Sequence, residues 1–559
     1  MRRSEAILQI PEFSFNRSVY KSVGFSNEEL EKPIIGIANS WSELVPGSYN
    51  LRQLADSVKK GIYAAGGTAV EFGFIGACDG TAQGCSGMNY ILPSRDLIAN
   101  DIEIMVQAHR LDAVVMLGSC DKIVPGMMIA AARLSIPVII LPGGPMLGGK
   151  FFDGRKSDLT SVSEAVGMLK SGKLTLDEFS RLEDDASPTC GSCSFFGTAN
   201  TMCCLAEAIG LTLPQGALTP AVYAERTRIA YKTGKQIVDM VNRNITGDQI
   251  ITRKSIENAI RVLMATSGST NAVMHLTAVA AEIDIRPEDM MNMFDRLGDS
   301  TPQIAKVNPA SRYNMEDFYL SGGIPQVMYE LRNVLNLDCM TVTGKTVGEN
   351  IKEIGCNSSV NRECIKTFEE PFSAKNGVAI LHGNIAPLGA VTKPGAIHPD
   401  MLCFEGAAKV FDCEEKAEVA ILDGKIQKGD VVVIRYEGPK GGPGMREMYK
   451  AMKYLYGLGL GKDTAVITDG RFSGTNNGCF VGHISPEAAD GGVIAVIEDG
   501  DKIVIDIKNK TIRLSIPEKE IAERLEKWKR PAKKFRKGYL ALYERMAASA
   551  SEGAVLKIR

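Results

Sequence analysis

The sequence has no long hydrophobic run and no excess of charge of either sign. Its apolar segments stay below the roughly 18 to 20 residues that span a bilayer, and the N-terminal stretch MRRSEAILQIPEFSFNRS lacks the features of a signal peptide. With 64 basic and 66 acidic residues, the formal net charge is -2, without the basic excess of nucleic-acid-binding proteins. We therefore expect a cytoplasmic protein whose partners are small molecules, with no nucleic acid and no membrane among them.

Histidine is scarce, and several common catalytic motifs are missing. The five histidines form no ligand-spaced pair, and no second CxxC accompanies the one made by Cys190 and Cys193. Neither a Walker A motif nor a G-x-S-x-G motif occurs. The composition therefore does not indicate a histidine-based mechanism, a zinc knuckle or a serine hydrolase.

Cysteine, by contrast, is plentiful. Thirteen cysteines in a cytoplasmic protein are not expected to form disulfides, so most should be small buried hydrophobes and a few could be metal ligands. Cys203 and Cys204 lie in the apolar helical pattern TANTMCCLAEAIGL, which predicts core packing.

At 559 residues the chain is too long for one hydrophobic core and should form at least two domains. Short apolar runs first alternate with helical patterns, which is typical of parallel βαβ units. The apolar runs are residues 32–40, 69–80, 111–121 and 136–144, and the helical patterns are residues 50–67 and 94–110.

A mostly helical stretch follows over residues 160–335, and short β-rich runs with turns begin at about residue 372. These runs are residues 377–384, 417–424, 429–438, 464–470 and 491–516. The sequence thus predicts an α/β protein. Residues 1–371 should form a doubly wound parallel-sheet domain with helical cover, and residues 372–559 a mainly β, barrel-like domain.

Cysteine and aspartate follow two of the predicted strands as adjacent pairs. Cys78 precedes Asp79 in ACDGT, and Cys120 precedes Asp121 in SCDK. A single aspartate at such a position is more often a turn or cap residue. Because the pair occurs at two successive strand ends, we expect thiolates and carboxylates to converge in one cleft, where the carboxylates could bind Mg2+.

Three further segments carry chemistry but are less specific. The CxxC of Cys190 and Cys193 precedes a predicted helix whose dipole would favour thiolate, and redox, zinc and iron-sulfur sites all use this spacing. The glycine-rich loop RYEGPKGGPGMREM could present backbone N–H groups or acids to an anion or a metal. Ser473 lies between glycines after an apolar run, where a serine is usually a turn residue.

Together these segments resemble the dihydroxy-acid dehydratase and phosphogluconate dehydratase family over nearly the whole chain. The segments that carry the resemblance are PIIGIANSW, GGTAVEF, CDGTAQG, LPSRDLIA, CDKIVPGM, CGSCSFFGTANTM, GSTNAVMHL, GNIAPLGAVTKPG, RYEGPKGGPGM, TDGRFSG and GHISPEA. The resemblance implies that Cys120 and Cys193 bind an iron-sulfur cluster, either 2Fe-2S or 4Fe-4S, and that Ser473 is the catalytic base. It assigns Mg2+ to Asp79, Asp121, Glu447 and Lys122, the lysine as its carbamate.

The sequence departs from the family pattern in two loops. Many members have a cysteine where this chain has Gly47, and others have histidines at Ser48 and Asn50; a further histidine is usual at Cys85. The third cluster ligand is therefore open. The candidates are Cys78, Cys85 and Cys190, with Cys78 ranked first because it follows a strand beside Asp79.

The resemblance implies a hydro-lyase that dehydrates a 2,3-dihydroxy acid to a 2-keto acid and assembles as a homodimer or homotetramer. We expect 2,3-dihydroxy-3-methyl acids, the intermediates of branched-chain amino-acid biosynthesis, as substrates. Sugar acids such as gluconate are the alternative. A non-catalytic iron-sulfur sensor is a third reading, suggested by the altered loops.

Overall fold

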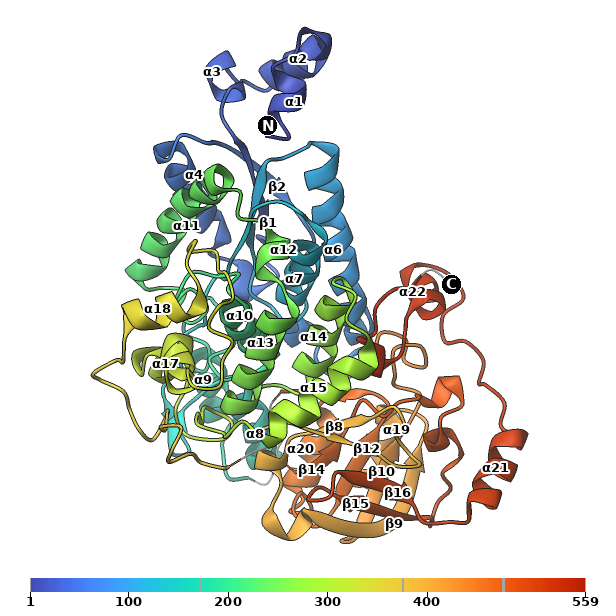
Figure 1. Cartoon of the computed structure of the whole chain (residues 1–559). Coiled ribbons are helices and arrows are strands. Elements are labelled where there is room, and N and C mark those ends of the chain that lie inside the picture. The colour runs from blue at the N-terminus through green and yellow to red at the C-terminus, as the bar shows by residue number, and fades with distance from the viewer. Residues whose placement is uncertain (1, 171, 375–376, 475–477, 558–559) are drawn as a thin grey trace.

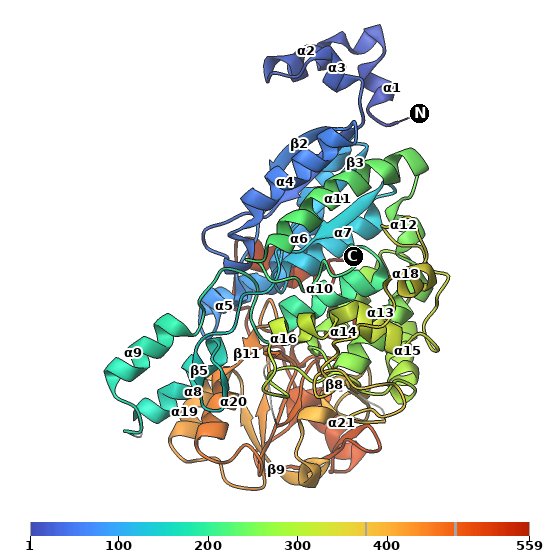
Figure 2. The same cartoon turned by 90° about the vertical axis from the view of Figure 1, so that its left-hand side faces the viewer.

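The computed structural model describes residues 2–170, 172–374, 377–474 and 478–557. Three short helices, α1 (Glu5–Leu8), α2 (Ser14–Ser22) and α3 (Asn27–Leu30), project from one end of the molecule, at the top of Figures 1 and 2. A four-stranded sheet follows directly below them, and a six-stranded sheet lies at the opposite end. No helix in the described ranges is long and apolar enough to cross a bilayer.

The N-terminal sheet is entirely parallel, with the strand order β2-β1-β3-β4. Its strands are β1 (Ile34–Asn39), β2 (Thr68–Gly73), β3 (Ala113–Leu117) and β4 (Val138–Leu141), and all residues of β1, β3 and β4 are buried. Helices α4 (Leu51–Ala64) and α11 (Ala224–Arg243) cover one face, and α6 (Ile91–Ala108) and α7 (Ile123–Arg133) the other (Figure 1). This doubly wound arrangement confirms the prediction for the first half of the chain.

The order of these strands also locates a ligand site. β1 lies between β2 and β3, so the chain runs outward from β1 to β2 and then crosses back to β3 on the other side of β1. In such sheets ligands bind outside the carboxyl ends of the strands, where the order reverses. The loops after β1, β2 and β3 meet at this edge, and they contain both Cys-Asp pairs.

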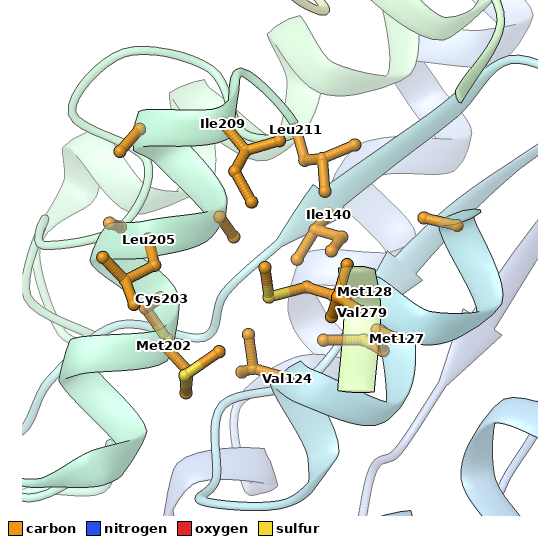
Figure 3. Packing of buried hydrophobic residues seen from close by; sticks show 14 of the residues in the cluster. Val124, Met127, Met128, Ile140, Met202, Cys203, Leu205, Ile209, Leu211 and Val279 are labelled. Atoms are coloured by element: carbon orange, nitrogen blue, oxygen red, sulfur yellow. The ribbon is translucent and has the colours of Figure 1, made fainter. Parts of the chain in front are cut away.

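A helical layer joins the two halves, as predicted for residues 160–335. Its core helices are α10 (Thr198–Ile209), α13 (Arg253–Thr266), α14 (Asn271–Ala281) and α15 (Pro287–Asp299). Figure 3 shows Met202, Cys203 and Leu205 of α10 packed towards α7 and Ile140 of β4. Cys203 and Cys204 are each 1% exposed, which confirms that they pack in the core.

Shorter helices and two small hairpin strands complete this region. They are α5 (Asp79–Ala82), β5 (Phe151–Phe152), β6 (Arg155–Lys156), α8 (Leu159–Lys170), α9 (Leu176–Asp185), α12 (Gly247–Ile250), α16 (Met315–Leu320), α17 (Gly323–Glu330) and α18 (Val347–Ile354).

The C-terminal sheet is mixed, with the strand order β14-β12-β10-β9-β15-β16. Its strands are β9 (Cys403–Phe411), β10 (Asp430–Ile434), β12 (Ala465–Thr468), β14 (Cys479–Val481), β15 (Lys502–Asp506) and β16 (Thr511–Leu514). The first four in spatial order are parallel, and β15 and β16 are antiparallel to their neighbours.

The hairpin of β7 (Ala379–Leu381) and β8 (Ala390–Thr392) reaches both edges of this sheet. His382, after β7, bridges to Thr511 of β16, and Val391 of β8 bridges to Gly482, just after β14. The hairpin therefore curves the sheet towards closure, and the barrel-like prediction for the second half is confirmed.

Residues 417–424 are not a strand, which corrects the sequence-based expectation. Residues 417–422 belong to α19 (Glu414–Leu422), and 423–424 form the turn after it. Later helices of this half are α20 (Lys450–Gly457), α21 (Glu518–Lys527) and α22 (Tyr539–Met546). Ala417, Ala420 and Ile421 are the buried apolar residues of α19, and their spacing of three and four is that of one helix face. The short apolar run was therefore misread because a buried helix face and a strand look alike over a few residues.

The domain boundary after residue 371 stays a prediction. One hydrophobic cluster extends through the N-terminal half to Ile365, and it also includes Ile380, Val391, Ala548 and Val555 from the second half. The end of the chain thus returns to pack on the N-terminal half.

Candidate active site

A cavity of about 220 Å³ lies between the carboxyl edge of the N-terminal sheet and the C-terminal half. Its lining includes Asp79, Asp121, Cys193, Glu447 and Ser473, so the structure brings together five residues that the resemblance or the strand ends singled out. They come from segments far apart in the chain, and only the fold makes them neighbours.

Three carboxylates lie together at one side of the cavity. Asp79 begins α5, Asp121 follows β3, and Glu447 begins β11 (Glu447–Met448); one oxygen of each lies within 4.8 Å of the others. Burial, together with the negative charges of Asp121 and Glu447, raises the pKa of Asp79 well above its usual value. Such mutually repelling oxygen donors form a suitable binding site for a divalent cation.

Lys122 lies behind these carboxylates and is fully buried. Its Nζ is 3.3 Å from Oδ2 of Asp121 and 3.8 Å from Oε1 of Glu447. The amine therefore contacts the proposed ligand set directly, which is the position that a carbamate ligand would need. The carbamate itself stays a prediction.

Two thiols lie against one of these carboxylates, that of Asp79. The Sγ atoms of Cys78 and Cys120 and a carboxylate oxygen of Asp79 are all within 4.8 Å of one another, and Cys120 donates to Asp79 Oδ1 at 3.1 Å. The neighbouring Cys120 thiol lowers the pKa of the Cys78 thiol from its usual value. This shift favours the thiolate, the form that binds metals.

The other candidate cysteines lie in different surroundings. Cys193 lines the cavity, but α10 begins only at Thr198, and burial raises the pKa of the Cys193 thiol well above its usual value. The expected thiolate-favouring position immediately before a helix was therefore wrong. Cys85 is exposed and donates to the carbonyl of Ala82, and Cys190 is only partly buried.

The divergent first loop is occupied by structural contacts. A Cβ at Gly47 would lie 2.6 Å from the carbonyl oxygen of Ser119, so this backbone leaves no room for a side chain there. The hydroxyl of Ser48 lies 3.1 Å from that of Ser40, and Asn50 donates to the carbonyl of Gly143. In this conformation the side chains of Ser48 and Asn50 contact the segments that follow β1 and β4, and the loop provides no cysteine ligand.

Ser473 directly follows β13 (Arg471–Phe472), a two-residue strand that pairs in parallel with β11. The backbone N–H of Ser473 donates to the carbonyl of Met448, which fixes the turn beside Glu447. The next residue packs on the first turn of α10, since a Cβ at Gly474 would lie 3.3 Å from the backbone nitrogen of Thr198. The positive end of the α10 dipole is therefore close to the serine.

Sequence reasoning missed several residues of this site. Arg471 is fully buried and forms an ion pair with Glu447, and the side chain of Asn271 also donates to this carboxylate. Tyr449, Thr160 and Ser163 also line the cavity. Asn271 and Arg471 lie in two of the segments quoted for the resemblance, but their residue types alone did not mark them.

The comparisons with known proteins cover almost the whole chain. Residues 32–350 match the family described as Dihydroxy-acid/6-phosphogluconate dehydratase N-terminal, and residues 363–554 match its C-terminal counterpart. A Dihydroxy-acid dehydratase of Caldanaerobacter subterraneus subsp. tengcongensis is 52% identical over 559 residues, covering 99% of each chain. Proteins of the same name from Acetivibrio thermocellus and Pyrococcus furiosus are each 49% identical, covering 99% of this chain and 100% of theirs. With both halves matched in order, the chain belongs to the dihydroxy-acid/6-phosphogluconate dehydratase family.

Proposed function

We propose that this chain is a dihydroxy-acid dehydratase, a hydro-lyase that converts a 2,3-dihydroxy acid to a 2-keto acid. The observation that carries the proposal is a single cavity lined by three clustered carboxylates, the Cys193 thiol and a serine, with the thiols of Cys78 and Cys120 beside Asp79. The relatives named above support it, because each carries this name and aligns over its whole length.

The donor atoms fit the two cofactors expected for the family. The oxygens of Asp79, Asp121 and Glu447 suit Mg2+. The adjacent thiols of Cys78 and Cys120, together with the Cys193 thiol in the cavity lining, suit an iron-sulfur cluster. We propose Cys78 as the third cluster ligand because it lies beside Cys120, whereas Cys85 is exposed. When bound, the two centres would supply Lewis-acid chemistry, polarising the substrate carboxylate and the leaving C3 hydroxyl.

Ser473 is the proposed base, and its Oγ would take the proton from C2 of the substrate. Loss of this proton and of hydroxide from C3 gives an enol, which tautomerises to the 2-keto acid. A serine hydroxyl is a weak base at its usual pKa, so it needs positive charge nearby. The N-terminal turn of α10, against which Gly474 packs, provides such an environment.

The lining of the cavity supports a substrate with an alkyl tail. Leu159, Phe195 and the ring of Tyr449 contribute apolar surface to it. Of its hydroxyls, Thr160 Oγ1 donates to Asp158 at 2.5 Å and Ser163 donates to the carbonyl of Leu159 at 3.3 Å, so these two donors are already engaged. We therefore favour 2,3-dihydroxy-3-methyl acids over sugar acids, whose hydroxyl chains need more polar partners.

A keto-acid assay after anaerobic reconstitution with iron, sulfide and Mg2+ tests this proposal. We expect turnover of 2,3-dihydroxy-3-methylbutanoate well above that of gluconate. Higher activity on gluconate would contradict the substrate assignment. A fully loaded cluster with no keto acid from either compound would favour the sensor reading instead.

Replacing the proposed cluster ligands should abolish the visible absorbance of the reconstituted protein. Cys78→Ser, Cys120→Ser and Cys193→Ser each replace a soft thiolate with a hydroxyl, a much poorer iron ligand. Cys203→Ser is the control, because Cys203 packs in the core and should affect only stability. A Cys78→Ser variant with wild-type absorbance would remove Cys78 from the ligand set.

We further propose a cytoplasmic location and a homodimeric or homotetrameric assembly. Size-exclusion chromatography with light scattering would test the assembly, and a monomeric mass would contradict it.

A further inference from the structure

Asn271 is fully buried at the start of α14, yet its side chain reaches the C-terminal half of the chain. Its Nδ2 donates to Oε1 of Glu447 at 2.5 Å and to Oγ1 of Thr198 at 3.0 Å, and the carbonyl oxygen of Phe472 lies at 3.5 Å. Thr198 begins α10, whereas Glu447 and Phe472 belong to β11 and β13. One amide thus connects the N-terminal helices to both strands that carry the C-terminal part of the site.

The donors around Glu447 act on one oxygen of its carboxylate. Asn271 Nδ2 and Arg471 Nη1 both donate to Oε1, and Glu447 is only 3% exposed. Within the part of the chain that the structure describes, these two are the side-chain hydrogen-bond donors to this carboxylate; Lys122 Nζ lies 3.8 Å from the same Oε1, and none of the three contacts uses Oε2. The carboxylate is therefore held in one orientation, with Oε2 left for another ligand.

The backbone of Asn271, from which the side-chain amide projects, is fixed by the turn that precedes α14. Ser269 Oγ accepts from the backbone N–H of Asn271 at 3.3 Å and lies 2.8 Å from Thr198 Oγ1. The backbone N–H of Ser269 donates to Oγ1 of Thr201 at 3.1 Å. These side chains are all buried, so the direction of the amide is set by the fold of α10 and α14.

Packing alone does not explain an asparagine at this position. Its Oδ1 is buried and has no hydrogen-bond partner among the described residues. A buried acceptor without a partner lowers stability, and an apolar side chain of similar size would avoid that loss. What an apolar side chain could not do is donate to Glu447.

We propose that Asn271 is a positioning residue that fixes the Glu447 carboxylate from across the domain boundary, so that Glu447 binds a divalent cation together with Asp79 and Asp121. The inference rests on the cation site of the proposed function and adds a residue that touches neither cation nor substrate. Loss of a residue that orients a metal ligand typically weakens metal binding by about 10- to 100-fold.

Mn2+ binding to the reconstituted protein, followed by the electron paramagnetic resonance signal of free Mn2+, tests the role directly. Asn271→Ala should raise the Kd for Mn2+ by about 10- to 100-fold and lower kcat in the presence of Mg2+. Asn258→Ala is the matched control: Asn258 is a fully buried asparagine of α13 that donates to the carbonyl of Asn336. It should lower the Tm and leave the Mn2+ affinity unchanged.

Asn271→Ser is a second variant, which keeps a small polar side chain and disturbs packing less if the alanine variant folds poorly. It should show the same loss of Mn2+ affinity. A folded Asn271 variant with wild-type Mn2+ affinity and kcat, even with a lowered Tm, would overturn the inference. If the wild-type protein itself failed to bind Mn2+, the proposed cation site would be wrong, which is a separate result.

Discussion

Asp121→Asn is expected to abolish turnover and to weaken Mn2+ binding more than about a hundredfold, since removing even a residue that only orients a metal ligand costs up to that factor. The change keeps the size of the side chain but removes one negative charge from the three clustered carboxylates. It also removes the anionic partner of the Lys122 amine, 3.3 Å away. Isothermal titration with Mn2+ and the keto-acid assay would measure the two effects.

Asp112→Asn is the matched control for this variant. Asp112 is buried immediately before the first residue of β3, at the end of the strand away from the cavity. There it accepts hydrogen bonds from the backbone N–H groups of Ser4 and Ile34. The control should lower the Tm while Mn2+ affinity and turnover stay close to wild type. Near-normal Mn2+ binding by Asp121→Asn would exclude Asp121 as a ligand.

Lys122→Arg tests whether position 122 needs a carbamate or only a positive charge. Arginine keeps the positive charge but cannot form a carbamate, so the variant should lose turnover if the modified lysine is a ligand. Mass spectrometry of the intact wild-type protein under bicarbonate would look for the added carbon dioxide. Substantial activity of Lys122→Arg would rule out the carbamate role.

The part of the site that could be derived from the residues alone lies on the N-terminal sheet. Parallel strands end at one edge, so the pairs at Cys78-Asp79 and Cys120-Asp121 had to converge once the strands before them were recognised. Glu447 and Ser473 could not be found this way. They reach the N-terminal half of the chain through β11 and β13, strands of two residues each, which are too short to leave a periodic pattern.

The strand β9 and the residue Asn271 were both missed because their roles depend on partners that are distant in the sequence. The strand β9 has the sequence CFEGAAKVF, where glycine and two alanines weaken the β-branched signal, and its register depends on pairing with β10 and β15. Asn271 is the first residue of a mostly apolar helix, where periodicity marks only a core face. Its role depends on which group lies opposite it, and that group, Glu447, is distant in sequence.

Replacing Ser473 with alanine should reduce kcat by a factor of about a hundred to ten thousand, the usual range for loss of a general base. Both metal centres should remain, because Ser473 is not among the proposed ligands. KM should change little, since proton transfer from C2 matters chiefly in the transition state. The keto-acid assay, the visible spectrum and Mn2+ titration on the same preparation would separate these effects.

Exchange of the C2 hydrogen with deuterated solvent gives a second readout of the Ser473→Ala variant. If the wild-type enzyme exchanges this hydrogen in unreacted substrate, the variant should not, because the group that removes the proton is missing. Ser485→Ala is the control, since Ser485 is fully buried and donates to the carbonyl of His483. The control should keep both kcat and exchange. A Ser473→Ala variant with near wild-type kcat would show that another group takes the proton, and the packing of Gly474 on α10 would then serve only to shape the cavity.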